Sequence, residues 1–271
     1  GMLEKTFAVI PREEIFAETG VQLMAINSLY QLYAMKLAAS PALASATRLL
    51  FIPDLLNYWL TGVPRAEQTI ASTSQFYNPR TRTWATTLFD RLGLPTSILP
   101  EIVAPGTRIG NLLPEIAETS GFDAPVPVYA TACHDTASAV AAVPVSGDKG
   151  WCYISSGTWS LLGAEIDAPI VNDRALELNF TNEMGADGKV RLLKNIAGLW
   201  LLQECRRAWA LEGKEYSYAD LAAMAEAAPP SRLRIDPDEF LSPGTMPEQI
   251  AGHCRERGER VPEDLGAFCR L

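Results

Sequence analysis

The chain has 271 residues, of which 48% are hydrophobic and 20% charged, a balance typical of a globular protein with a sizeable core. Its net charge of −9 argues against general binding to nucleic acid or to an anionic membrane, although a local site for an anion stays compatible with it. Five scattered cysteines without a CxxC pair and two histidines argue against dense disulfides and against a metal site, so we expect no metal ligands. Free thiols in a cytoplasmic protein are the simpler interpretation of these cysteines. No apolar run approaches the roughly 20 residues of a membrane span, and the N-terminus lacks a basic-then-apolar signal pattern.

The first half of the chain predicts helices with recognisable ends. Helices are expected over 11–20, 53–62 and 83–93, and each ends at a glycine, the residue most common just beyond a helix. Asn27 is placed to cap a further helix over 28–40, because its side chain can accept from free backbone N–H groups there.

The second half mixes strands with helices. Turn formers in the stretch 144–150 mark a boundary between two lobes, and the Pro-rich stretch 228–247 is expected to be irregular. Helices followed by strands and then by alternation predict an α/β protein of two lobes. The expected strands cover 125–132, 151–155, 159–165 and 189–194, and the expected helices lie near 196–211 and 218–227.

One charged pair stands where a predicted strand passes into a predicted helix. In "TACHDTASAVAAVP" (131–144), His134 and Asp135 follow an apolar run and precede small residues. From spacing alone an N-cap is the commoner role for such an aspartate, and His134 is more often a hydrogen-bonded polar residue than a catalyst. The cap is compatible with catalysis, because a carboxylate held at a strand end can accept a proton from a substrate hydroxyl.

Two further stretches could carry chemistry. In "YISSGTWSLLGAE" (153–165), Ser156-Gly157 predicts a tight hairpin turn whose N–H groups could hold phosphate oxygens, with an ordinary hairpin as the alternative. In "LLKNIAGLWLLQ" (192–203), Asn195 could cap a helix that carries Gln203 two turns later, with a plain cap and a solvated glutamine as the alternative. The common phosphate-loop, dinucleotide and zinc-protease motifs are missing.

Taken in order, "FIPDLLNYWLTG", "ACHDTASAVAAVP", "YISSGTWSLLGAE" and "NFTNEMGADGKVRLLKNIAGLWLLQ" resemble the FGGY carbohydrate kinase family, and within it the kinases of L-rhamnulose. The resemblance covers essentially the whole chain. It implies an actin-like (ribonuclease-H-like) α/β fold of two lobes, here incomplete, with the active site in the cleft between them. Residues 1–145 would form the later part of the N-terminal lobe, with a helical insertion, the sugar side and the catalytic aspartate. Residues 146–271 would form the early part of the C-terminal lobe on the ATP-phosphate side.

The resemblance also implies an activity and its residues. The family uses ATP and Mg²⁺, and the implied reaction converts a small sugar, L-rhamnulose, to L-rhamnulose 1-phosphate in rhamnose catabolism. Asp135 matches the catalytic base. Asp135 is also expected to contact the sugar, together with His134, Thr136 and Asn195. The expected ATP contacts are Gly157, Thr158 and Gln203.

The family's chains are longer than this one. An amino-terminal Asp-Gly hairpin that binds phosphate and metal, and a Gly-rich adenosine segment, have no counterpart here. We therefore expect the isolated chain to have little or no activity and to self-associate through surfaces left open. The alternatives are another FGGY kinase, acting on fuculose, xylulose or a polyol, and a noncatalytic sugar-binding remnant. A non-kinase actin-like ATPase is disfavoured, because "HDTASAV" and "SSGTWS" together follow the sugar-kinase pattern.

Overall fold

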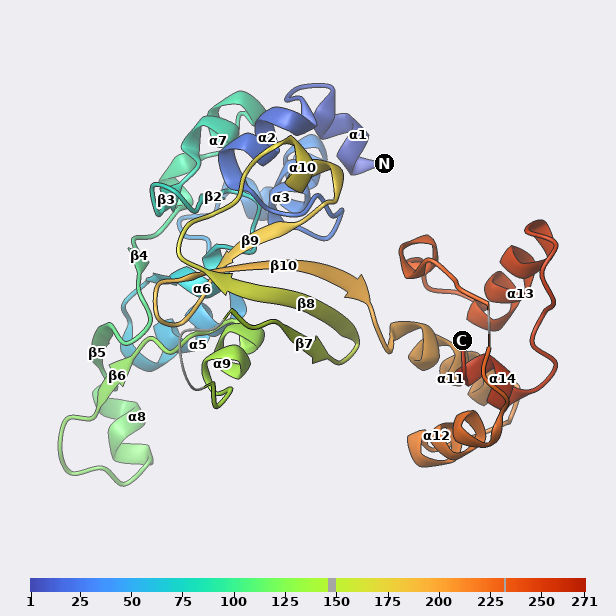
Figure 1. Cartoon of the computed structure of the whole chain (residues 1–271). Helices are drawn as coiled ribbons and strands as arrows, with labels where there is room; N and C mark the ends of the chain where they lie inside the picture. Colours follow the sequence, from blue (N-terminus) through green and yellow to red (C-terminus); the bar gives the residue numbers. More distant parts are fainter. Residues whose placement is uncertain (146–149, 232) are drawn as a thin grey trace. The chain divides into compact units, whose positions relative to one another are not determined.

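A computed structural model describes residues 1–145, 150–231 and 233–271 of the chain (Figure 1). Within these ranges, no helix combines the length and the apolar character needed to cross a membrane. The predicted lobe boundary at 145/146 adjoins residues 146–149, which lie outside the described residues.

The backbone divides into two compact units. The first contains Gly1–Tyr153 and Gly163–Lys194, and the second contains Ile154–Leu162 and Asn195–Leu271. The second unit therefore contains the tip of the hairpin formed by residues 153–166 as well as the carboxyl-terminal helices.

Most helices belong to the first unit. Three of them end at Gly20, Gly62 and Gly93, which adopt the left-handed conformation that glycine enters at least cost, so these predicted helix ends are confirmed. The helices are α1 (Met2–Phe7), α2 (Arg12–Thr19), α3 (Ser28–Leu37), α4 (Pro41–Ala44), α5 (Ile52–Thr61), α6 (Gln68–Ala71), α7 (Thr86–Leu92), the 3-10 helix η1 (Thr96–Ile98), α8 (Pro114–Thr119), α9 (Asp135–Ala141) and α10 (Asp173–Glu177).

In the part of the chain that the structure describes, the strands form one four-stranded sheet and three two-stranded pairs. The four-stranded sheet has the order β7-β8-β10-β9 and is visible in the yellow-green and orange part of Figure 1. The pairs are β1-β4, β2-β3 and β5-β6. The strands are β1 (Ala66–Glu67), β2 (Tyr77–Asn78), β3 (Thr83–Trp84), β4 (Ile102–Val103), β5 (Arg108–Asn111), β6 (Pro127–Tyr129), β7 (Tyr153–Ser156), β8 (Trp159–Ile166), β9 (Thr181–Met184) and β10 (Val190–Ala197).

Each unit has its own hydrophobic core. In the first, residues of α2, α3 and α7 pack around Phe76, which contacts Phe89 edge-to-face with ring centroids 5.1 Å apart. In the second, Trp209, Leu221, Phe240 and other apolar residues form the core. That core is built by α11 (Trp200–Leu211), α12 (Tyr218–Ala227), the 3-10 helix η2 (Pro237–Phe240), α13 (Met246–Glu256) and α14 (Leu265–Cys269).

Two predicted helix caps were wrong. Asn27 precedes α3, but its amide nitrogen donates to the Gln22 carbonyl and to Gln75 Oε1 instead of its side chain capping the helix. Asn195 lies inside β10, because that strand runs on to Ala197, and α11 begins only at Trp200. The stretch 228–247 is irregular over most of its described part, as expected, with η2 and the first two residues of α13 as the exceptions.

Candidate active site

The Asp135 carboxylate projects into solvent at the start of α9. Its side chain is 96% exposed, and its Oδ1 accepts from the N–H of the next residue, Thr136, at 2.6 Å. The N-cap position belongs to His134, and in the described residues Asp135 does not cap the helix as spacing had suggested. An exposed carboxylate at a fixed backbone position is suited to meet a substrate hydroxyl.

The backbone just before Asp135 is held by two side chains from a distant stretch. Glu67 is buried and caps α6, where its carboxylate accepts from the N–H groups of Thr69 and Ile70. The same carboxylate accepts from the Cys133 N–H at 3.0 Å, and the Thr69 hydroxyl oxygen accepts from the His134 N–H at 3.0 Å. The start of α6 therefore sets the path of the chain into α9.

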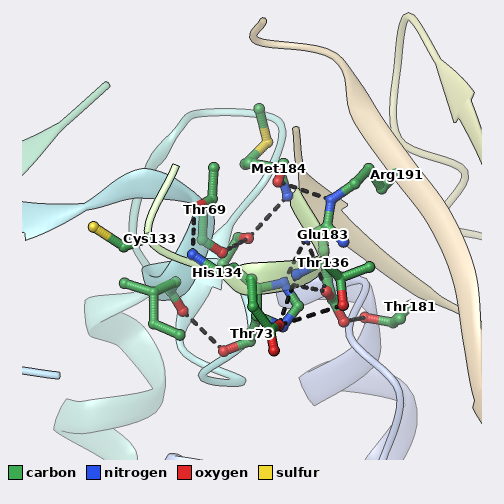
Figure 2. A network of polar contacts seen from close by, with 12 residues as sticks. Thr69, Thr73, Cys133, His134, Thr136, Thr181, Glu183, Met184 and Arg191 are labelled. Atoms are coloured by element: carbon green, nitrogen blue, oxygen red, sulfur yellow. Dashed lines mark hydrogen bonds and ion pairs between the residues drawn. The ribbon is translucent and has the colours of Figure 1, made fainter. Parts of the chain in front are cut away.

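A buried ion pair lies beside His134, as Figure 2 shows. Arg191 of β10 and Glu183 of β9 are cross-strand partners in the antiparallel register, and Arg191 Nη2 lies 3.2 Å from Glu183 Oε2. The Arg191 side chain is 0% exposed and that of Glu183 is 5% exposed. Nη2 of Arg191 also lies 2.8 Å from Nδ1 of His134. The opposite nitrogen of that ring, Nε2, lies 3.6 Å from Asp135 Oδ1.

Burial dominates the protonation of neighbouring groups. It lowers the pKa of His134, a shift opposed by the Glu183 charge and reinforced by Arg191. Burial, followed by the Glu67 charge, raises the pKa of Cys133 to about 11, so its thiol stays protonated and is a poor nucleophile near neutral pH. Burial raises the pKa of Asp54 to about 7.

The second unit brings the three predicted ATP contacts together. Gly157 and Thr158 form the turn between β7 and β8, which confirms the predicted hairpin with its turn one residue later than expected. Gln203, in the first turn of α11, donates from Nε2 to Thr158 Oγ1 at 3.1 Å. The Gly157 N–H is already donated to the Trp159 carbonyl at 2.7 Å, so in this conformation the turn offers side-chain groups in place of that amide.

The same turn packs tightly against the chain that enters α11. The carbonyl of Thr158 accepts from the N–H groups of Gly198 and Trp200, and the carbonyl of Gly157 accepts from that of Leu199. A Cβ placed on Gly198 would lie 2.9 Å from the Gly157 carbonyl oxygen and 2.4 Å from Ser160 Oγ. Glycine is therefore required at 198 for the turn to reach this position.

The other predicted sugar contacts differ in their surroundings. Thr136 is buried next to Asp135, with its hydroxyl 3.4 Å from Asp135 Oδ1. Asn195 lies in β10 and is the first residue of the second unit's main segment.

Glu67, Thr69, Glu183 and Arg191 were missed in the sequence. A charged residue between two apolar neighbours, in "VRL" (190–192), was the available signal for Arg191. Its two partners lie on other elements, and no spacing rule connects them to it.

The chain is similar over its whole length to curated proteins named rhamnulokinase. One from Bacteroides thetaiotaomicron is 43% identical over 272 residues, covering 100% of this chain and 55% of the relative. One from Oceanobacillus iheyensis is 43% identical over 264 residues, covering 97% of this chain and 55% of the relative. The chain thus spans about half the length of the curated relatives it matches.

Solved sugar kinases share the fold at low sequence identity. A xylulose kinase from Rhodospirillum rubrum aligns over 99% of this chain and 54% of its own, with a TM-score of 0.69 at 18% identity. One from Lactobacillus acidophilus aligns over 84% of this chain and 45% of its own, with a TM-score of 0.67 at 21% identity. The predicted actin-like, ribonuclease-H-like α/β fold is confirmed, and the chain contains parts of both lobes.

Family models match both halves of the chain. The N-terminal domain of the FGGY family of carbohydrate kinases matches residues 3–142, and the C-terminal domain of that family matches residues 152–270. The chain belongs to the FGGY family of carbohydrate kinases.

Proposed function

We propose that this chain is part of an ATP-dependent kinase that converts L-rhamnulose to L-rhamnulose 1-phosphate in the cytoplasm. The main support is the similarity to curated rhamnulokinases at 38–43% identity. These alignments cover 95–100% of this chain and so include both the Asp135 region and the Ser-Gly-Thr turn. Five free cysteines support a reducing compartment.

Asp135 would act as the proton acceptor. As the oxygen of the sugar hydroxyl attacks the γ-phosphorus, a bond forms between that oxygen and phosphorus and the bond from phosphorus to the ADP oxygen breaks. The hydroxyl proton passes to the Asp135 carboxylate. His134, Thr136 and Asn195 would contact the sugar. The exposure of Asp135 fits this role, since a carboxylate sealed in the core could not meet a substrate.

Thr158 and Gln203 would bind the phosphates of ATP beside Gly157. Because the Thr158 oxygen accepts from Gln203 Nε2, its own O–H is free to be aimed at a phosphate oxygen, and this donor set suits an anion. Mg²⁺ bound with ATP would neutralise charge that develops on the phosphates. We assign no metal ligand to this chain.

A chimera gives the sharpest test. The chain would replace the matching stretch of the Bacteroides thetaiotaomicron rhamnulokinase, and ADP release would be coupled to an optical readout with L-rhamnulose, L-fuculose or L-xylulose as substrate. We expect turnover that prefers L-rhamnulose. In the matched variant Asp135→Asn, kcat should fall by roughly 10²–10⁴-fold, the usual contribution of a general base.

The chain alone is the companion sample and should show little or no turnover. A folded, monodisperse chimera that phosphorylates another of the sugars better, or none of them, would overturn the substrate assignment. Calorimetry with L-rhamnulose on the chain alone distinguishes the kinase from the noncatalytic sugar-binding remnant. Sugar binding by the chain together with an inactive chimera would favour the remnant.

A further inference from the structure

A second layer of residues beneath Asp135 has no part in the proposed chemistry. The buried Arg191 and Glu183 contact His134 (Figure 2). The Nε2 atom of His134 in turn lies 3.6 Å from Asp135 Oδ1. An ion pair buried this deeply costs desolvation free energy and is weak as a stabilising device, so its contact with His134 suggests a more specific role.

The protonation of the His134 ring follows from its neighbours. A guanidinium has N–H donors and no acceptor, so Arg191 Nη2 at 2.8 Å from Nδ1 can only donate to it. Nδ1 must then carry a lone pair and no hydrogen. A neutral imidazole bears one N–H, which is left on Nε2, the nitrogen 3.6 Å from Asp135 Oδ1.

We propose that Arg191, oriented by Glu183, is a positioning residue that holds His134 as the neutral tautomer with its proton on Nε2, directed at the Asp135 carboxylate. The alternative tautomer would direct an Nδ1–H at Glu183 Oε2, 3.5 Å away, but it would also press that hydrogen against the Arg191 N–H. Arg191 therefore favours the tautomer with the proton on Nε2 over the tautomer with the proton on Nδ1.

The charged groups around His134 come from four elements. Arg191 lies on β10, Glu183 on β9, Asp135 on α9, and Glu67 at the start of α6. Burial lowers the pKa of His134 below its ordinary 6.5, which agrees with a neutral ring near pH 7.

Neutrality has a chemical consequence. A cationic imidazolium beside Asp135 would stabilise the ionised carboxylate and weaken it as a proton acceptor. A neutral Nε2–H that faces the carboxylate leaves most of its negative charge available. This part of the inference rests on the proposed role of Asp135, whereas the tautomer itself does not.

The test is a long-range ¹H–¹⁵N NMR correlation on the chain labelled at histidine. The chain has two histidines, and the His134 signals are identified by their loss in His134→Gln. We expect Nε2–H to be favoured over Nδ1–H at least about tenfold at pH 8, the ratio that a charged hydrogen bond of ordinary strength supplies. We also expect the ring to stay neutral as the pH falls past 6.5. A protonated Nδ1, or an even mixture of tautomers, overturns the proposal.

Two further measurements isolate Arg191. In Arg191→Met the tenfold preference should be lost, while Arg174→Met, which removes an exposed arginine paired with Glu177, should leave the His134 signals unchanged. Should Arg191→Met fail to fold, the unaltered protein can be tested for a scalar coupling across the hydrogen bond from Arg191 Nη2 to His134 Nδ1. The presence of this coupling supports Arg191 as the donor, and its absence excludes Arg191. These readouts use neither sugar nor ATP, so their failure leaves the proposed kinase function standing.

Discussion

Asp54 makes the stability of the first unit depend on pH. It lies on α5, and its Oδ1 accepts from the Glu67 N–H at 2.9 Å, while Oδ2 has no hydrogen-bond partner among the described residues. Burial first, with help from the Glu67 charge, raises the pKa of Asp54 from 3.8 to about 7. The folded state thus binds more protons than the unfolded state between these values, and the free energy of unfolding falls as the pH rises through this window.

The variant Asp54→Asn removes this titration and keeps an oxygen that can accept from Glu67. With a folded pKa of about 7 and an unfolded chain already ionised, raising the pH from 6 to 8 should cost wild type about 1.4 kcal/mol relative to the variant. Most of that loss should occur below pH 7.

Urea unfolding of both proteins at pH 6, 7 and 8 measures the difference, in which other titrating groups cancel. Asp90→Asn, at an exposed position on α7, is the matched control and should run parallel to wild type. If the difference between wild type and Asp54→Asn stays constant across the three pH values, the Asp54 carboxyl is not held in its protonated form by burial.

Two other substitutions test the packing described above. Gly198→Ala should destabilise the second unit by about 1–3 kcal/mol, because its Cβ meets the backbone of the turn. Gly252→Ala within α13 should stabilise that unit by about 0.5–1 kcal/mol, because its Cβ would meet no atom within 4 Å beyond its chain neighbours and the backbone of its own helix. Equal effects of the two substitutions in thermal unfolding would contradict the close approach at Gly198. Arg191→Met should lower the free energy of unfolding by about 3–5 kcal/mol, since it leaves the buried Glu183 charge without its ion-pair partner. Glu183→Gln added to Arg191→Met should recover part of this loss. Removing the exposed Arg174 should cost less than about 1 kcal/mol in the same chemical denaturation assay.

Local rules predicted the helix ends and the hairpin, because these features depend on neighbours in the sequence. Gly62 ends α5 whatever packs around it, and Gly157 turns the chain between two short strands. The cap expected at Asn195 failed because pairing with neighbouring strands extends β10 beyond it. Tertiary contacts overrode a correct local preference there.

The candidate site was predictable only in part, for a related reason. Asp135 and Thr158 stand in stretches whose residue types resemble a family, so their positions could be read directly. Arg191 and Glu67 act through partners 57 and 66 residues away along the chain, and the burial that gives them their effect comes from folding. Single-sequence patterns carry no information on such pairings.

The amide hydrogens of Cys133 and His134 are bonded to side chains of Glu67 and Thr69 and not to a neighbouring strand. They can exchange with deuterium only when α6 separates from the segment that leads into α9. Their exchange rates therefore report how often α6 separates from the segment that carries Asp135. They can be measured without any ligand and compared between wild type and each variant.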